Sequence, residues 1–272
     1  MKRIAPRSKI TRIALLAIAL GLLAQFGLAR TGAAQPAEAQ ISAKPLASPA
    51  PDLPEIDALW MRGERPALES IARSLDPQAN PYKASFVLWR LHSLNRNQDP
   101  QNDYQAAAID RAEQLAEALT KDESISQSER VEALVLLSSI LGIRADGSLF
   151  QRMRLGRAAH LVINEARELD EANPRAKLQH AILLFHTPST FGGGPAAALP
   201  LLLEARRDLD PKNQPAPSGP PWGWLDASAW VGQTLAALDR EEEARQVYEE
   251  TLAREPAMGW IRHQLLPALS AN

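Results

Sequence analysis

The residues most suggestive of chemistry are the three consecutive glycines at 192–194, which run into Pro195 within the segment FHTPSTFGGGPAAALPLL. Glycine-rich turns that open a helix cradle phosphate, because free backbone N–H groups and the helix dipole favour an anion. A P-loop, however, needs a lysine and a hydroxyl residue directly after its last glycine, and neither follows Gly194. A dinucleotide fingerprint needs a third glycine where Ala197 stands. The sequence therefore predicts a structural turn or a binding loop, with an anion at the amides of 196–198 as the alternative.

Other side chains that could do chemistry lack the neighbours that the chemistry requires. Ser189 does not lie in a Gly-x-Ser-x-Gly elbow, which a serine hydrolase of that class would need. The glutamates at 241–243 fit the start of a helix and a solvated face better than a catalytic pair. The histidines show neither an HExxH motif nor a pair at i, i+4 spacing, which a metal site would favour; they are His92, His160, His180, His186 and His263. We therefore expect no enzyme activity, no metal and no cofactor.

Aromatic residues gather behind a proline-rich stretch. Trp222, Trp224 and Trp230 are half of the six tryptophans and lie within nine residues. They either pack in the core or form an aromatic patch that binds a peptide. The second alternative is considered because tryptophan and arginine dominate binding hot spots. Phe191 beside the glycines is a second candidate of this kind. The predicted partner-binding set also includes two residues of an expected inward-facing helix at 174–186, and its members are Phe191, Gly192, Gly193, Gly194, Trp222, Trp224, Arg175 and Gln179.

Composition bounds the class of protein. The chain has 272 residues, of which 45% are hydrophobic, and its net charge is −2. That balance offers no basic field for nucleic acid, so we expect no nucleic-acid partner. Cysteine is absent, which excludes disulfides and thiolate metal sites. Alanine and leucine are abundant and aromatic residues are scarce, which favours helices over sheets.

The amino-terminal residues match a targeting segment. Five basic residues within the first twelve precede seventeen uncharged residues at 13–29 and then a run of small residues. This order predicts a signal peptide at 1–34 and a periplasmic or secreted protein. The alternative is an uncleaved anchor in the inner membrane, with the body facing the periplasm. Residues 35–53 are rich in alanine and proline and are expected to form a disordered linker, which leaves 54–272 as the folded body.

The spacing of apolar residues in this body is helical throughout. Leu178, Ala181, Ile182 and Phe185, for example, lie on one face of a helix. The related segments LDPQANP, LDEANP and LDPKNQP each close a helical stretch, and the first two also open the next one. Proline cannot continue a helix but fits well in its first turn. Helix-boundary segments that recur in this way predict an all-α repeat architecture of about ten or eleven helices, or roughly five helix pairs.

Two stretches carry a family resemblance. Residues 225–258 resemble a tetratricopeptide repeat (TPR) through Gly232, Ala244, Tyr248 and Pro256 at the family spacing. Small residues at 232 and 244 would let the paired helices approach closely, and Tyr248 would fill the space against the neighbouring repeat. The segments NPRA…FHTPSTFGGGPAAALPLLLEA and PPWGWLDASAWVGQ are similar to a group of uncharacterised exported bacterial TPR-like proteins. The resemblance implies a TPR-like helical-hairpin solenoid and brings no activity with it.

The expected function is a scaffold that mediates protein–protein interaction in the bacterial cell envelope, with an unknown protein partner. The first alternative is a small-ligand-binding protein or enzyme with a site formed by the 187–195 glycine loop and the 222–224 tryptophan segment. A pocket that joins these two segments would favour that alternative, and their separation would count against it. The second alternative is a structural spacer tethered to the membrane by the amino-terminal segment.

Overall fold

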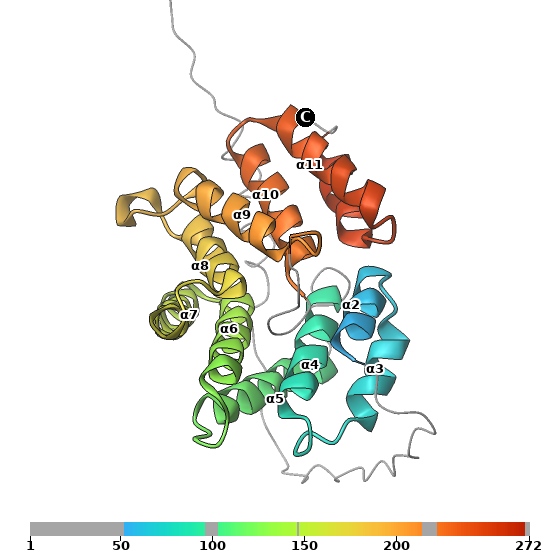
Figure 1. Cartoon of the computed structure of the whole chain (residues 1–272), viewed down its shortest axis with the longest axis vertical. Coiled ribbons are helices and arrows are strands. Elements are labelled where there is room, and N and C mark those ends of the chain that lie inside the picture. The colour runs from blue at the N-terminus through green and yellow to red at the C-terminus, as the bar shows by residue number, and fades with distance from the viewer. Residues whose placement is uncertain (1–51, 96–102, 146, 214–221, 270–272) are drawn as a thin grey trace, which may run out of the picture. The chain divides into compact units, whose positions relative to one another are not determined.

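The computed structural model describes residues 52–95, 103–145, 147–213 and 222–269 (Figure 1). This part of the chain contains eleven α-helices and no strand, so the predicted all-α class is confirmed. No helix within these ranges is both long enough and apolar enough to cross a bilayer. The expected signal peptide at 1–34 lies outside the described residues, as does the expected linker at 35–53 apart from its last two residues.

The described helices all belong to one unit of the chain, Ala43–Asn272. The first of them begins one residue before the predicted start of the folded body. In chain order the helices are α2 (Leu53–Met61), α3 (Arg65–Ser74), α4 (Pro81–Asn95), α5 (Asp103–Thr120), α6 (Gln127–Arg144), α7 (Leu149–Leu169), α8 (Pro174–His186), α9 (Pro195–Leu209), α10 (Trp224–Ala237), α11 (Glu241–Arg254) and α12 (Leu266–Ala268), with a 3-10 turn η1 (Ser189–Phe191) and a π-helical turn η2 (Ile261–Leu265).

Packing follows the order of the chain. Each helix from α2 to α11 contacts the next one along the sequence (Figure 1). In addition, α2, α4, α6, α8 and α10 contact one another in turn, and we call these five helices the inner row. Buried apolar side chains from all helices between α2 and α11 belong to one continuous cluster. The inner row therefore forms the centre against which the other helices pack.

Proline and asparagine set the helix boundaries where the sequence predicts them. Pro81 begins α4, and Pro174 begins α8. Asn173 caps α8, because its side-chain oxygen accepts hydrogen bonds of 3.0 Å from the backbone N–H groups of Arg175 and Ala176. These bonds satisfy two of the donors that a helix start leaves unpaired.

The sequence contains two segments of the capping-box type, Ser126 to Glu129 and Asp239 to Glu242, and one of these boxes is present in the structure. Ser126 and Glu129 form the reciprocal pair of bonds at the start of α6. The one predicted for Asp239 and Glu242 at the start of α11 is wrong, because the N-cap of that helix is Arg240, whose side chain makes no capping bond. Asp239 instead adopts a left-handed conformation with φ of 59° and forms the turn before α11.

The helices α10 and α11 pack closely through a glycine. A Cβ atom at Gly232 would lie only 2.1 Å from Cε1 of Tyr248, so the tyrosine ring lies directly on the glycine backbone. Ala244 is fully buried, and Pro256 is exposed just after the end of α11. The close approach predicted for this helix pair is therefore present. The predicted role of Tyr248 changes, because its ring packs on Gly232 of its own pair, whereas the sequence suggested the neighbouring repeat.

Candidate functional site

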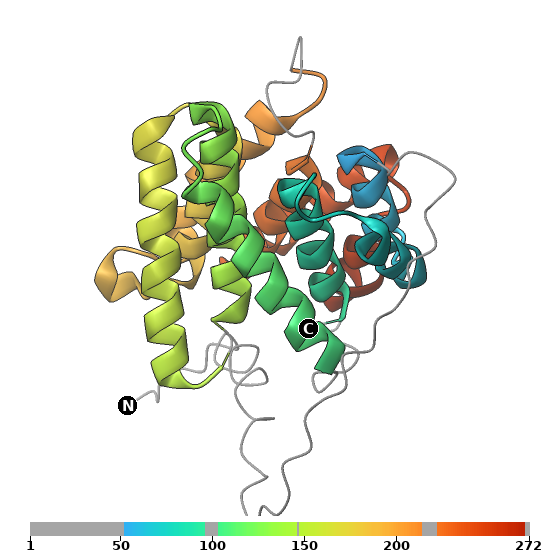
Figure 2. The same cartoon turned by 90° about the horizontal axis from the view of Figure 1, so that it is seen from below.

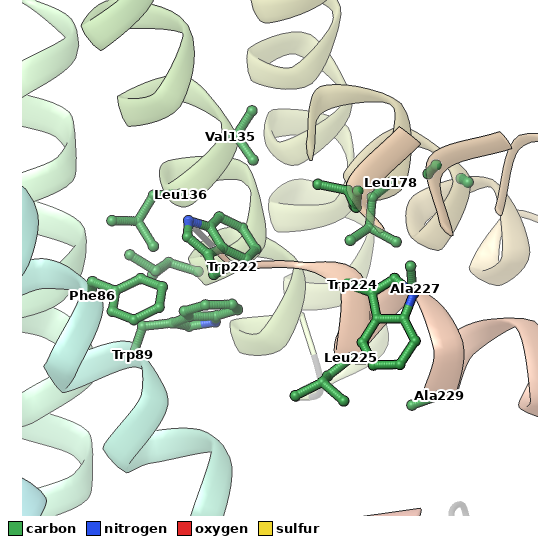
Figure 3. Packing of buried hydrophobic residues seen from close by; sticks show 14 of the residues in the cluster. Phe86, Trp89, Val135, Leu136, Leu178, Trp222, Trp224, Leu225, Ala227 and Ala229 are labelled. Carbon is green, nitrogen blue, oxygen red and sulfur yellow. The ribbon is translucent and has the colours of Figure 1, made fainter. Parts of the chain in front are cut away.

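Trp222 lies between two helices of the inner row. Its ring centroid is 5.7 Å from that of Phe86 and 5.5 Å from that of Trp89, both on α4. Its Nε1–H donates a hydrogen bond of 3.1 Å to the hydroxyl of Tyr82. Leu136 of α6 belongs to the same cluster of buried side chains (Figure 3). With 6% of its surface exposed, Trp222 is a core residue.

Arg90 on α4 connects three helices of the inner row. Its Nε donates to Asp57 of α2 at 2.7 Å, and its two terminal nitrogens donate to the two carboxylate oxygens of Asp226 on α10, each at 2.8 Å. The guanidinium carbon lies 4.0 Å from the ring centroid of Trp60 and 4.3 Å from that of Trp89. Only 1% of Arg90 is exposed. Bidentate pairing and stacking on aromatic rings are the contacts that stabilise a buried guanidinium.

This cluster holds one cation and two carboxylates. Burial raises the pKa of Asp57 to about 6; Arg90 opposes this shift and the charge of Asp226 adds to it. Burial by itself would lower the pKa of Arg90, but Asp226 and Asp57 together raise it, so the guanidinium stays charged. When Asp57 is protonated, the cluster holds one cation, Arg90, and one anion, Asp226, so its net charge is zero.

A second buried ion pair joins α6 to α8. Arg175 donates from Nε and Nη2 to the two carboxylate oxygens of Glu132, each at 2.7 Å. The side-chain amide of Asn173 adds a bond of 2.8 Å to the same carboxylate. One turn along α8, the side-chain oxygen of Gln179 accepts a bond of 3.1 Å from the hydroxyl of Ser139. Arg175 and Gln179 are therefore bound within the inner row.

Trp224 lies at a third ion pair. The guanidinium carbon of Arg254 is 3.8 Å from the centroid of the Trp224 ring, and Arg254 also donates to both carboxylate oxygens of Asp210 at 2.7 and 2.8 Å. These bonds lower the pKa of Asp210 to about 2. Gly223 before Trp224 has φ of 112°, and a Cβ there would lie 3.2 Å from Leu209. Glycine at this position lets the backbone at the start of α10 lie close to Leu209 at the end of α9.

The structure thus brings together four of the predicted partner-binding residues in the interior. Trp222, Trp224, Arg175 and Gln179 each have less than a tenth of their surface exposed. Such side chains offer no surface to a partner, so the packing interpretation of the tryptophans is favoured over the binding patch. Partner binding by these residues stays a prediction, and it would require the inner row to open.

The glycine loop, residues 187–195, lies at the other end of α8. Gly192 and Gly194 have positive φ angles of 80° and 99°, which residues with a Cβ atom rarely adopt. Such angles fit the turn that the sequence predicts here. Gly193 is needed for a different reason, because a Cβ there would lie 2.4 Å from the backbone oxygen of Thr187. All three glycines therefore shape the connection from α8 to α9, which begins at Pro195 as predicted.

Backbone bonds within the glycine loop use the donors that a phosphate would need. The N–H groups of the three glycines donate to backbone oxygens of residues 189, 188 and 184, and those of residues 197 and 198 donate to the carbonyl of Gly194. A phosphate cradle requires such groups to be free and convergent. The structural turn is therefore favoured over the anion site that the sequence left open.

Phe191 projects from this hydrogen-bonded loop. It is 79% exposed, the highest value among large hydrophobic residues in the described ranges. The loop is fixed to the helices by Thr187, whose hydroxyl donates to the carbonyl of Leu183 at 2.9 Å and lies 3.1 Å from Nε2 of His160 on α7. An exposed phenylalanine on a fixed loop is a preorganised apolar anchor, and we take the glycine loop with Phe191 as the candidate functional site.

The glycine loop and the tryptophan segment do not share a pocket. Gly223 lies near Arg175, close to the first turn of α8, whereas the glycine loop follows its last residue, His186. A helix of 13 residues is roughly 20 Å long at 1.5 Å per residue. This separation counts against the small-ligand or enzyme site that the sequence suggested for the two segments together.

A shallow cleft of about 220 Å³ lies between α7, α8 and α9. It is smaller than the roughly 300–1,000 Å³ of typical ligand pockets, and its lining residues include Arg167, Lys177, His180 and Glu204. Burial, and then the charge of Arg167, lowers the pKa of His180 to about 4, so this histidine is neutral at pH 7. Within the described ranges, no three or more His, Asp or Glu residues are arranged to hold a metal ion.

The buried ion pairs were not predicted from the sequence, although each of these charges interrupts an apolar run. Arg90 interrupts the apolar run SFVLWRLH, and Glu132 interrupts RVEALVLL. Asp226 lies between large apolar residues in WLDASAW. A single charge inside an apolar helical run indicates a buried ion pair, because unpaired burial is too costly. The identity of the partner, however, follows only from the three-dimensional fold.

Comparison with known proteins gives no further constraint on this site. No protein-family model, no curated protein and no solved structure matches the chain.

Proposed function

We propose that the protein is an exported, TPR-like scaffold that mediates protein–protein interaction in the bacterial cell envelope. In this proposal α2 and α3, α4 and α5, α6 and α7, α8 and α9, and α10 and α11 are five helix pairs of a solenoid. Its support is the contact of each helix with the next and of every second helix along the inner row. The order of basic, uncharged and small residues at 1–34 supports export to the periplasm.

The partner-binding surface of this scaffold is proposed to lie outside the inner row. In an open solenoid the first helices of the pairs line a groove that takes the partner. Here that row is occupied by the side chains of the chain itself, above all by Trp222 and by the Arg90 ion pairs. A partner is therefore expected to bind the glycine loop, where Phe191 is available without any rearrangement.

The single observation that carries the proposal is the exposure of Phe191 on a fixed loop. Burying one phenylalanine side chain stabilises a complex by roughly 1.5–3 kcal/mol through the hydrophobic effect alone. Because the loop is already held by its own hydrogen bonds, little additional ordering opposes binding.

The test is cross-linking in intact cells, followed by purification of the full chain and identification of bound proteins. We compare the native chain with Phe191→Ser and with the control Thr190→Ala, which changes an exposed neighbour in the same loop. The proposal predicts a stoichiometric partner that is retained by Thr190→Ala and lost with Phe191→Ser. Recovery of the native chain alone, while the cross-linker captures known complexes, would contradict it.

A further inference from the structure

The first thirteen of the 21 residues of α7, 149–161, expose an apolar stripe. Leu149, Phe150, Met153 and Leu161 are 72%, 77%, 67% and 62% exposed. They are four of the six large hydrophobic residues that are exposed in the described part of the chain, so exposed apolar surface is concentrated on this one helix. Scattered apolar residues need no explanation, but a concentrated set indicates a binding surface.

The stripe lies opposite the side by which α7 is held. Leu155, Ala159 and Ile163 are buried, and α7 packs on α6 and α8 (Figure 2). On a helix with 3.6 residues per turn, the four exposed apolar residues fall within roughly one third of the circumference, on the far side from the buried residues. Residues 149–161 of α7 are thus apolar on two opposite faces, and one of these lacks a covering helix among the described residues.

Exposed arginines lie beside this stripe and, in the case of Arg157, within it, between Met153 and Leu161 on the same helix face. Arg152, Arg154 and Arg157 are all exposed. Arg154 and Arg157 have no carboxylate partner in the described ranges, and Arg152 donates from Nε to the carbonyl of Gly147. No Asp or Glu occurs between residues 149 and 164, although the chain as a whole has a net charge of −2. The start of α7 therefore combines apolar surface with concentrated positive charge, to which the helix dipole adds.

This combination fits the surface of an anionic membrane. Apolar side chains of an interfacial helix enter the boundary between headgroups and acyl chains, and arginines at its edges bind lipid phosphates. A second copy of the chain fits less well, because a symmetric contact through the same patch would bring the arginines of both copies together. The positive charge beside the apolar stripe is therefore complementary to lipid phosphate, whereas the same patch on a second copy would repel it.

We propose that residues 149–161 of α7 dock on membranes that contain anionic phospholipid. Leu149, Phe150, Met153 and Leu161 enter the interface, while Arg154 and Arg157 bind headgroup phosphates. This docking is independent of the partner proposed for Phe191.

The test uses the full chain and exploits its lack of cysteine. Met153→Cys and the control Glu249→Cys, on the exposed side of α11, are each labelled with an environment-sensitive fluorophore. The labelled chains are titrated with vesicles of phosphatidylcholine alone or with phosphatidylglycerol added. A label reports its own position, so binding through the uncharged residues 13–29 would not by itself produce the signal at 153.

We expect the label at 153 to shift to the blue only with vesicles that contain phosphatidylglycerol, and the label at 249 to remain unchanged. Adding Arg154→Gln and Arg157→Gln should weaken the response by roughly tenfold or more, whereas Arg111→Gln on α5 and Lys121→Gln directly after this helix should leave it unchanged. No shift at 153, or an equal shift with neutral vesicles, would overturn the proposal. A shift that depends on protein concentration without vesicles would also overturn it, in favour of self-association.

Discussion

The arginines of the inner row and those of α7 differ in burial and in ion pairing. Arg90 is buried, pairs with two carboxylates and stacks on tryptophan rings. Arg154 is exposed, with no carboxylate partner in the described ranges and with apolar neighbours in the exposed stripe. The same residue type thus holds the fold together in one region and remains available to a partner in the other. The difference lies in whether the fold supplies an anion, which the local sequence alone does not reveal.

The largest expected effect is at the centre of the inner row. Arg90→Met leaves Asp57 and Asp226 buried without their cation, and breaking a buried pair in this way typically costs about 3–5 kcal/mol of unfolding free energy. Denaturant titration followed by circular dichroism measures this loss. Arg111→Met, at an exposed arginine of α5, is the matched control and should change stability by less than about 0.5 kcal/mol. Equal losses of unfolding free energy in the two variants would show that the buried Arg90 stabilises the fold no more than an exposed arginine does.

The next effect concerns the packing of α10 on α11. Gly232→Ala places a Cβ 2.1 Å from the Tyr248 ring, and overpacking of this kind costs about 1–3 kcal/mol. Gly156→Ala on α7 is the control, because no atom lies within 4 Å of the added Cβ. That change should stabilise the protein by up to about 1 kcal/mol through helix propensity. Thermal unfolding of both variants decides the comparison, and destabilisation by Gly156→Ala would contradict the account of α7.

A smaller effect follows from the raised pKa of Asp57. Its pKa in the folded protein is about 6, compared with an ordinary value of 3.8. Between these values the folded state binds more protons than the unfolded state, so the contribution of Asp57 to stability falls as the pH rises from about 4 to 6. The slope of this contribution is at most about 1.4 kcal/mol per pH unit.

Asp57→Asn removes this contribution while keeping an oxygen that accepts from Arg90. The measurement is the free energy of unfolding of both proteins across this pH range. The native chain should lose stability relative to Asp57→Asn as the pH rises. Taking the difference matters because the lowered pKa of His180, about 4, acts in the opposite direction. A constant difference between the two proteins would show that Asp57 does not titrate in this window.

The smallest expected effect on stability is on α7 itself. Arg154→Gln with Arg157→Gln should change the free energy of unfolding by less than about 0.5 kcal/mol, because no ion pair in the described ranges is lost. The same double variant should bind anionic vesicles more weakly. A large loss of stability would place these arginines in the same class as Arg90.

Local features were predicted well from the sequence. Pro81, Pro174 and Pro195 begin helices as expected, and Gly232 lies where α10 and α11 approach closely. Such features depend on residues that are near in the chain or on a fixed repeat spacing. The Asp239 prediction failed because a left-handed turn residue was assigned a capping role.

Long-range features could not be predicted in this way. Trp222 and Trp224 are compatible with a core or with a binding patch, and only their contacts with Tyr82, Phe86 and Arg254 favour the core. Arg90 and Asp226 are 136 residues apart, and no local pattern connects them. The exposed stripe on α7 was also missed, because helical periodicity in the sequence does not say which apolar face is left uncovered.

The most direct test of the central claim is a double-mutant cycle between Arg90 and Asp226. The claim is that this pair joins α4 to α10, so that the inner row is filled by the chain itself. Unfolding free energies are measured for Arg90→Met, Asp226→Leu and both changes together, all in the Asp57→Asn background, where Asp226 is the carboxylate left to pair with Arg90. We predict a coupling of about 2 kcal/mol or more, because in this background each single change leaves a buried charge unpaired and the double change does not. Additivity within about 0.5 kcal/mol would contradict the claim.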